Sequence, residues 1–117
     1  MSADPSCLFC RIAAGDIPAD VVLDAERVLA FRDVNPQAPV HVLVIPKAHH
    51  RDAGSLADID PELAAEVLQT AAQVARDEGV DASGYRLVFN TGDHGGQAVH
   101  HVHAHVLGGR PMGWPPG

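Results

Sequence analysis

The sequence has few aromatic residues and few basic ones. Only 4% of its 117 residues are aromatic whereas 46% are hydrophobic, so the core must be built from Val, Leu, Ile and Ala. Lysine and arginine together number 8 against 15 aspartates and glutamates, which gives a formal net charge of −7. This acidic balance argues against broad electrostatic binding to nucleic acid or to an anionic membrane. A phosphate ligand would need a local pocket.

Long apolar runs are absent as well, and cysteine is rare. No stretch is long enough to span a membrane, and residues 1–5 lack the basic and then apolar segments of an export signal. We therefore expect a cytoplasmic protein. The two cysteines, Cys7 and Cys10, have the spacing of a metal half-site or a redox pair, and a structural disulfide is not expected in that compartment.

The chain length and the residue patterns predict one α+β domain over residues 1–117. A helical period predicts one long helix over residues 61–78, and a short amphipathic pattern predicts an N-terminal helix over 7–15. Residues 91–97 are predicted to form a flexible loop. Five strands, which suggest an antiparallel sheet with 41–46 at its centre, are predicted at 21–23, 28–31, 41–46, 85–90 and 101–107.

The predicted strand at 101–107 carries a row of histidines. Side chains alternate along a strand, so His101, His103 and His105 would share one face, about 6.6 to 6.8 Å apart. Val102, Ala104 and Val106 would then form an apolar opposite face. Each imidazole brings two nitrogens that need partners, which makes a row of three costly unless it serves chemistry. The alternative is a polar sheet face that happens to use histidine.

Glycines gather just before these histidines. Gly92, Gly95 and Gly96 allow unusual backbone angles and can bring N–H groups close to an oxyanion, as in loops that bind phosphate. Such clusters also occur in plain hairpin turns. Here the loop leads directly into the histidines, so a bound phosphate would meet a nucleophile.

Three segments of the chain resemble the histidine triad (HIT) family in its Hint branch, namely residues 31–47 apart from Arg32, 95–110 and 114–117. The family motif, His-φ-His-φ-His-φ-φ with φ apolar, matches 101–107 and follows Gly-Gly-Gln. Gly-Gly-Arg at 108–110 and the terminal Trp-Pro-Pro-Gly favour Hint over the dinucleoside polyphosphate hydrolases. The resemblance covers nearly the whole chain and implies a HIT-like fold.

This resemblance implies catalytic roles for four histidines. The middle motif histidine, the family nucleophile, falls on His103, which would attack the α-phosphorus of a nucleoside monophosphate derivative and hold the nucleotidyl group covalently until water releases it. His101 and His105 match the outer motif histidines, and His105 would touch the non-bridging phosphate oxygens. His41 matches an additional family histidine. A neutral imidazole has one free nitrogen for such an attack if an acceptor fixes the other N–H.

The resemblance also implies a nucleotide site. Asp33 matches the carboxylate that holds the ribose hydroxyls, although it could simply cap the turn before Asn35 and Pro36. Phe9, Ile17, Phe31 and Val34 match the apolar walls around the purine, although on sequence alone Phe9, Phe31 and Val34 are more often core residues than pocket residues. Asn90, Gly96, Gln97 and Val99 match positions near the phosphate.

Some residues depart from the Hint pattern or add to it. Ala98 stands where the family often has a serine near the phosphate and the leaving group, so slow turnover is expected. His100 is an extra histidine, expected on the opposite strand face as an ordinary, partly exposed side chain. Cys7 and Cys10 resemble a structural zinc half-site of some bacterial members, with further ligands at His49, or alternatively His50, and at His101. The cysteines could instead be small buried residues.

The predicted function is therefore hydrolysis of the P–N bond of purine nucleoside phosphoramidates, with AMP derivatives as substrates and no organic cofactor. The alternatives are a dinucleoside or nucleoside polyphosphate hydrolase, a largely non-catalytic nucleotide-binding module, and a zinc site formed by the three motif histidines. A homodimer is predicted from the resemblance and from the alanine-rich face of the helix over 61–78. Alanine is also a good helix former, so this composition alone proves little.

Overall fold

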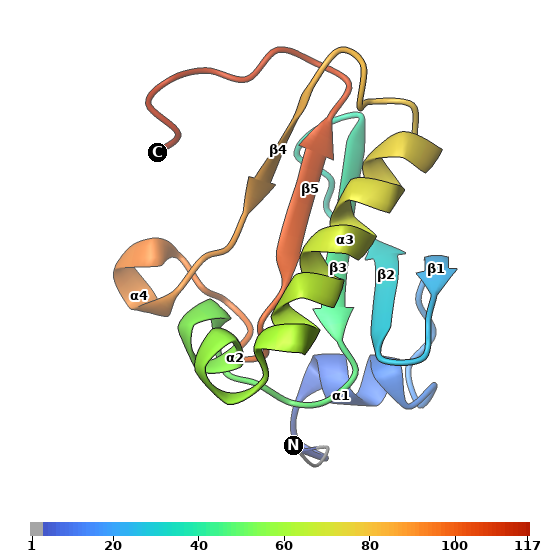
Figure 1. Cartoon of the computed structure of the whole chain (residues 1–117), viewed down its shortest axis with the longest axis vertical. Helices are drawn as coiled ribbons and strands as arrows, with labels where there is room; N and C mark the ends of the chain where they lie inside the picture. Colours follow the sequence, from blue (N-terminus) through green and yellow to red (C-terminus); the bar gives the residue numbers. More distant parts are fainter. Residues whose placement is uncertain (1–3) are drawn as a thin grey trace.

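The computed structural model describes residues 4–117 (Figure 1). Residues 1–3, which belong to the segment predicted to lack an export signal, lie outside the described residues. The helices are α1 (Leu8–Ala13), α2 (Ala53–Ile59), α3 (Pro61–Asp77) and α4 (Gly92–Gly95). The strands are β1 (Val21–Asp24), β2 (Val28–Arg32), β3 (Val40–Pro46), β4 (Tyr85–Val88) and β5 (Ala104–Gly108). None of the helices in residues 4–117 is long and apolar enough to cross a membrane.

The five strands form one antiparallel sheet with the order β1-β2-β3-β5-β4. The α+β class and the central position of β3 are therefore confirmed. In the β3–β5 pair, Val44 lies opposite Ala104 and Leu43 lies opposite His105. Because side chains alternate along each strand, this register gives the sheet one aliphatic face and one face that carries histidines.

The helix α3 covers the aliphatic face (Figure 1). Asp60 caps its N-terminus by accepting a hydrogen bond from the Leu63 N–H, and Pro61 occupies the first helical position. Leu63, Val67 and Ala71 are among the helix residues in the main core, where they join Val42, Val44, Ala104 and Val106 of the sheet. Burial of this aliphatic surface is the main source of stability, as expected for a sequence with so few rings.

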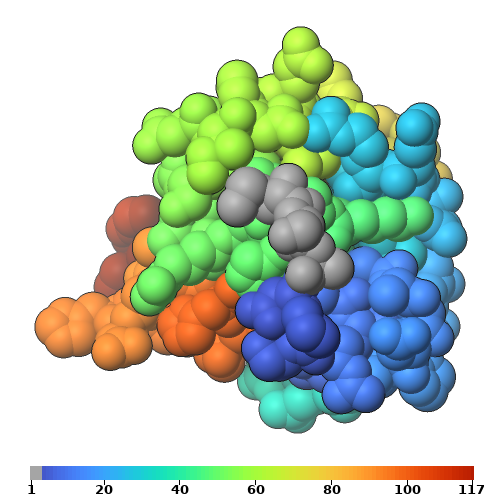
Figure 2. Space-filling view, turned by 90° about the horizontal axis from the view of Figure 1, so that it is seen from below, coloured from blue at the N-terminus to red at the C-terminus, as the bar shows by residue number. Residues whose placement is uncertain are grey.

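The helix α1 lies against the other face of the sheet. Phe9 packs edge-on against Phe31, with ring centroids 5.6 Å apart, in a second cluster with Leu29, Leu43 and Ile45. The N-terminal segment and the segment before β5 are far apart in sequence yet lie side by side at this end of the molecule (Figure 2).

Two local predictions need correction. The helix α2 was not predicted, because Gly54 weakens its helical pattern, whereas in the structure Asp52 caps it by accepting from the Ser55 N–H. Residues 91–97 were predicted to be a flexible loop, but they contain the short helix α4. The buried Gln97 side chain holds this segment by accepting from the Gly92 N–H at 3.0 Å.

Candidate active site and metal cluster

The strand that carries the histidines begins later than predicted. The ladder between β3 and β5 starts at Ala104, so His101 and His103 precede the strand and the expected row of three rings on one strand face is wrong. Pro46 at the end of β3 has no N–H, and its carbonyl accepts from the His101 ring at 2.8 Å. Val102, Ala104 and Val106 do face the aliphatic core as predicted.

His101 is fully buried and turned towards the N-terminal helix. Because a carbonyl can only accept, the bond to Pro46 assigns the ring proton to Nε2 and leaves a lone pair on Nδ1. That Nδ1 lies 3.4 Å from the Sγ atom of Cys7 and 3.4 Å from that of Cys10. Burial lowers the pKa of His101 to about 4, so the ring is neutral near pH 7.

His103 is held in the opposite tautomer. Its Nδ1 lies 2.8 Å from the backbone carbonyl of His101, so Nδ1 carries the proton and Nε2 keeps its lone pair. The ring is packed edge-on against Phe9 at a centroid distance of 5.0 Å and lies 5.0 Å from the ring of His105. Burial lowers the pKa of His103, which keeps the lone pair available near neutral pH.

A chain of hydrogen bonds also sets the tautomers of His41 and His105. The Gln37 backbone N–H donates to His41 Nδ1 at 3.0 Å, so the proton of His41 must be on Nε2. This Nε2 lies 2.9 Å from His105 Nδ1, which therefore accepts, and His105 carries its own proton on Nε2. Among the described residues, that buried Nε2 has no hydrogen-bond partner.

Both rings of this pair are neutral near pH 7. Burial, with a smaller contribution from the nearby His103 and His41 rings, lowers the pKa of His105 to about 4. Burial also lowers the pKa of His41, against the opposing effect of Asp33, whose Oδ2 lies 3.4 Å from His41 Nε2. The site thus presents a free lone pair on His103 beside an unpartnered N–H donor on His105.

An apolar pocket of about 420 Å³ opens beside these two histidines. Asp33 stands at its rim, and Val34 is fully exposed there rather than in the core. The predicted residues that line it are Phe9, Ile17, Phe31, Asp33, Val34, Ala98, Val99, His103 and His105. Sequence reasoning missed Leu8 and Ile12, whose four-residue spacing on α1 was the available signal.

Three of the residues predicted near the phosphate do not line this pocket. Asn90 lies instead in a groove of about 450 Å³ that His41, His105 and the C-terminal segment also line, so His105 borders both the groove and the apolar pocket. Gln97 is buried, and its amide donates to the backbone carbonyls of Arg51 and Val99, so it supports the loop. Gly96 ends α4 in the left-handed conformation with a φ of 79°, which explains the need for glycine there.

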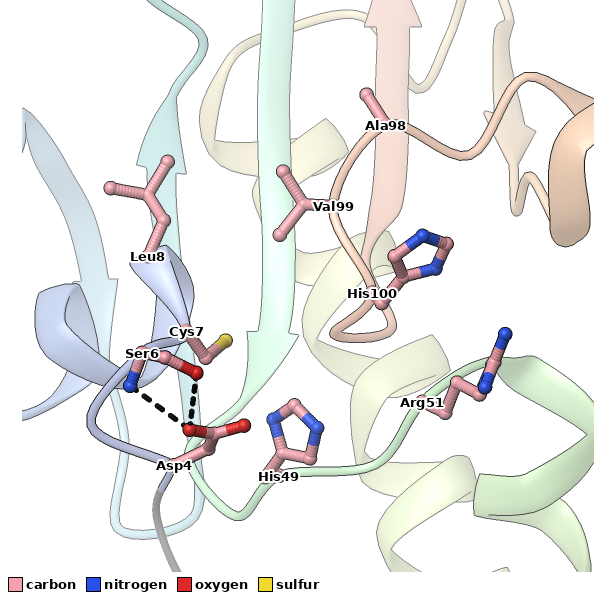
Figure 3. A pocket seen from close by; sticks show the side chains of 9 residues that line it. All are labelled: Asp4, Ser6, Cys7, Leu8, His49, Arg51, Ala98, Val99 and His100. Atoms are coloured by element: carbon pink, nitrogen blue, oxygen red, sulfur yellow. Dashed lines mark hydrogen bonds between the residues drawn. The ribbon is translucent and has the colours of Figure 1, made fainter.

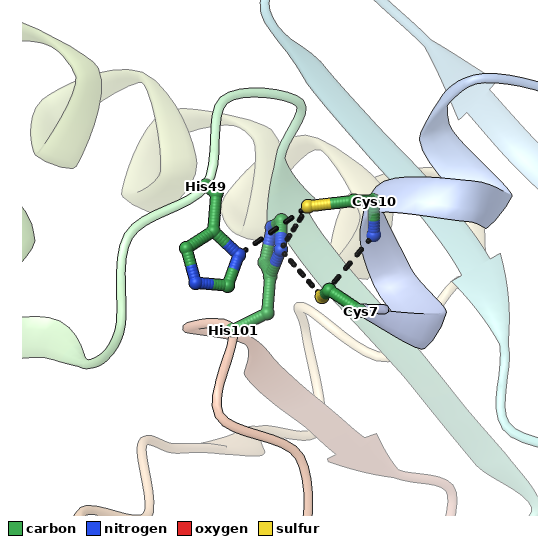
Figure 4. Close-up of side chains that lie close together, drawn as sticks. All are labelled: Cys7, Cys10, His49 and His101. Carbon is green, nitrogen blue, oxygen red and sulfur yellow. Dashed lines mark hydrogen bonds between the residues drawn. The ribbon is translucent and has the colours of Figure 1, made fainter. Parts of the chain in front are cut away.

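Four side chains near α1 form a candidate metal cluster (Figure 4). The ligand atoms of Cys7, Cys10, His49 and His101 all lie within 4.8 Å of one another, and Cys10 Sγ lies 3.3 Å from His49 Nδ1. His50 does not belong to this cluster. In a tetrahedral zinc site the ligand sulfur and nitrogen atoms are about 3.6 Å apart, close to the separations in this structure.

The donor set fits zinc chemically as well as geometrically. Two thiolates and two neutral imidazoles are a common structural zinc set, and the Pro46 carbonyl already orients the Nδ1 of His101 towards the sulfurs. Burial raises the pKa of the Cys10 thiol and so disfavours its thiolate. A cation bound beside the sulfur would stabilise the thiolate. Residues 4–117 contain no disulfide, because both cysteines are free.

A second pocket of about 480 Å³ borders the cluster (Figure 3). The half-buried Cys7 and His49 line it, and the exposed Arg51 and His100 stand at its edge. Ala98 and Val99 line both this pocket and the apolar one. His100 is exposed, but it precedes β5 and lies on neither face of that strand, because the strand begins only at Ala104; its expected place on the opposite strand face is therefore wrong.

The other histidine groupings are not suited to a metal. Asp33, His41 and His105 also bring potential ligand atoms within 4.8 Å, but the Nε2 atom of His41 carries the proton and offers no lone pair. His101, His103 and His105 do not form such a cluster within residues 4–117.

Comparison with known proteins gives concordant results. The model of the HIT domain matches residues 14–112. A "14 kDa zinc-binding protein" of Zea mays is 47% identical over 97% of this chain and 90% of its own length, and "Adenylylsulfatase HINT1" of Arabidopsis thaliana is 43% identical over 98% and 79%. Among solved structures, a HIT family hydrolase of Legionella pneumophila superimposes with a TM-score of 0.92 at 54% identity, covering 96% of this chain and all of that one. The chain therefore belongs to the HIT domain family.

Proposed function

We propose that this HIT protein hydrolyses purine nucleoside phosphoramidates through a covalent nucleotidyl intermediate on His103. One observation carries the proposal. The bond from His103 Nδ1 to the His101 carbonyl leaves the lone pair of Nε2 free on a neutral ring that lines the apolar pocket. An imidazole in this state is a nucleophile near neutral pH and needs no separate base.

The reaction has two displacement steps. His103 Nε2 attacks the α-phosphorus, the N–P bond to the ring forms, and the P–N bond to the amine breaks. The departing amine takes a proton from solvent, which reaches the site at the exposed Ala98. Water then attacks the same phosphorus, the bond to Nε2 breaks, nucleoside monophosphate leaves, and one proton of that water returns to solvent.

His105 stabilises the phosphoryl group in both steps. Its Nε2–H is buried without a partner among the described residues, so it can donate to a non-bridging phosphate oxygen without first losing another bond. Since the donor is already oriented by His41, little reorganisation is needed as negative charge develops. The other family histidine, His101, supports the nucleophile through its carbonyl.

The nucleoside occupies the apolar pocket. Phe9, Phe31 and Ile17 supply a flat apolar surface for the purine, and Asp33 at the rim accepts hydrogen bonds from the ribose hydroxyls. Ala98 and Val99 border the pocket where the phosphate would meet His103.

Hydrolysis of a phosphoanhydride is the second candidate. Ala98 has no hydroxyl to assist an amine, whereas sulfate or a polyphosphate departs as an anion and needs no proton. One relative is named an adenylylsulfatase. Parallel kcat/KM measurements with an adenosine phosphoramidate, adenylyl sulfate and a dinucleoside polyphosphate decide between the candidates.

The test of the chemistry is His103→Ala. We expect turnover to be abolished and AMP binding to be retained, because Asp33 and the apolar walls stay in place. His94→Ala, at an exposed histidine on α4, is the matched control and should keep wild-type kcat. If His103→Ala turns over substrate as fast as the wild type, the mechanism is contradicted. If the wild type binds AMP but turns over no substrate, a non-catalytic binding module is favoured.

We also propose that Cys7, Cys10, His49 and His101 bind a structural zinc ion. When bound, zinc would join α1 to the segment before β5, and its charge would stabilise both thiolates. The Zea mays relative, which is named a zinc-binding protein, supports this proposal. The carbonyl of His101 would then be held while its ring ligates the metal.

We also propose that the protein is a homodimer, but not on the ground of the alanine-rich face of α3. Ala71 and Ala75 of α3 are buried in the core, so the alanine-rich face does not by itself mark an interface. The exposed Leu68 and Trp114 and the edge strand β4 support the proposal instead. A single domain over residues 1–117 and a cytoplasmic location stay predictions.

A further inference from the structure

The loop between β2 and β3 is tied to the C-terminal segment next to the histidines. Arg110 Nη2 donates to the backbone carbonyl of Gln37 at 2.9 Å, from 73 residues further along the chain. Gly109 approaches the same loop so closely that a Cβ atom there would lie 2.8 Å from Pro39 Cβ. Gln37 also donates from its side-chain amide to the Asn35 carbonyl at 3.0 Å. The position of Gln37 is therefore fixed from several sides.

Gln37 matters because its backbone N–H makes the shorter of the two contacts that orient the His41 ring, the other being the contact with Asp33 at 3.4 Å. A backbone N–H can only donate, so it obliges His41 Nδ1 to accept. His41 must then donate from Nε2 to His105 Nδ1. The Nε2 atom of His105 is left as an N–H donor.

The opposite arrangement would reverse this polarity. If His41 carried its proton on Nδ1, its Nε2 would accept, and His105 would have to donate from Nδ1. The Nε2 atom of His105 would then present a lone pair to the oxygens of a phosphoryl group and would repel them. The hydrogen bond from the Gln37 N–H thus favours the tautomer in which His105 attracts the substrate phosphate.

We propose that Arg110 and the Gln37 backbone are positioning groups which, through His41, keep the N–H of His105 directed at the substrate phosphoryl group. The effect on catalysis rests on the proposed function. The assignment of the ring protons of His41 and His105 does not depend on it. Asp33 also favours a proton on His41 Nε2, but at 3.4 Å the contact is long. With the ribose bound to Asp33, Gln37 becomes the main determinant.

The test uses the full-length protein labelled with 15N-histidine and saturated with AMP. Long-range nitrogen–proton correlation spectra report which nitrogen of each ring carries the proton. We expect Nε2–H at both His41 and His105 in the wild type. In Arg110→Ala we expect a mixed tautomer at both rings and a kcat reduced about ten- to a hundredfold, below the full loss of an oxyanion donor.

Two further variants keep the result specific. Arg110→Lys keeps a donor for the Gln37 carbonyl and should restore both the spectra and most of kcat. Arg76→Ala is the control, since the exposed Arg76 on α3 donates to the Gln73 side chain at 3.0 Å and lines neither the groove beside His41 nor the apolar pocket. It should behave as the wild type.

Wild-type tautomers in Arg110→Ala would overturn the proposal, as would the same spectral change in Arg76→Ala. If the wild type turns over no nucleotide substrate, the proposed function fails. The tautomer spectra still decide the assignment of Arg110 and Gln37, because they do not depend on turnover.

Discussion

At the scale of single residues, hydrogen bonds fix the ionisable groups of the site. The carbonyls of Pro46 and His101 set the protons of His101 and His103, and the Gln37 N–H sets that of His41. None of these partners is a charged side chain. Neutral, oriented rings follow from backbone geometry and burial together.

Burial of neutral His105 predicts that acid destabilises the fold. The folded pKa is lowered to about 4 by burial, while the unfolded ring keeps its ordinary value near 6.5. Between these values the unfolded state binds a proton that the folded state does not, so the free energy of unfolding falls as the pH drops from about 6.5 to about 4. The contribution of this ring is at most about 3 kcal/mol and is fully present above pH 6.5.

The measurement is urea unfolding of wild type and His105→Asn at pH 7 and pH 4. Asn can still accept from His41 but does not titrate, so the variant should lose less stability on acidification. Equal losses in the two proteins would mean that His105 is not the ring responsible.

Ala98→Ser should raise the rate of phosphoramidate hydrolysis with little change in AMP affinity. Ala98 lines both the apolar pocket and the pocket that borders the metal cluster, so a hydroxyl there could bond to the leaving group or a phosphate oxygen. A hydrogen bond made mainly in the transition state is worth about 1 to 2 kcal/mol, or roughly five- to thirtyfold in rate.

Single-turnover rates with one amidate are the readout for this variant. Ala57→Ser on α2, at an exposed position that lines neither pocket, serves as the control. Equal or slower turnover by Ala98→Ser would indicate that a water molecule already fills this role.

At the scale of elements, long periodic patterns predicted the bounds of helices and strands better than short local signals did. The period of α3 and the apolar run of β3 are long, so both were predicted within two residues. The start of β5 could not be predicted, because it depends on the proline at the end of a strand distant in sequence. The helix α2 was missed because it is short and Gly54 weakens its helical pattern.

Zinc binding is testable at the junction of α1 with the segment before β5. Purified protein should contain about one zinc per chain, and a chelator should remove it, because the half-buried Cys7 and His49 line an open pocket. Loss of the metal should lower the melting temperature, since the cluster joins these two elements. Elemental analysis and thermal unfolding are the measurements.

Two histidine variants make the zinc test specific. His49→Ala should reduce the zinc content, whereas His50→Gln should not, because His50 lies outside the cluster. Protein prepared without chelator that contains no zinc would refute the metal site.

At the scale of the whole molecule, the resemblance to the HIT family predicted much of the candidate site. The structure brings nine predicted residues to one pocket, including Asp33 and His103. Asn90, Gly96 and Gln97, which were predicted near the phosphate, do not line that pocket, because a motif match carries no information on side-chain direction. The Cys/His cluster joins residues more than 90 positions apart, which only the fold could bring together.

A homodimer predicts a solution mass twice that of one chain. Light scattering at micromolar concentration measures this mass directly, and a monomer mass would contradict the proposal. The exposed Trp114 should then influence substrate preference, so Trp114→Ala should change the ratio of kcat/KM between amidates with different amines. An unchanged ratio would mean that Trp114 does not contribute to substrate selection.

The most direct test of the covalent mechanism is the intact mass of the protein quenched during a single turnover with an adenosine phosphoramidate. The quench must be alkaline, because a phosphorus bond to histidine is labile in acid. We predict a transient mass increase of one adenylyl group, located on His103 by peptide mapping and absent from His103→Ala. Product formation without any adduct, or an adduct on another histidine, would contradict the account.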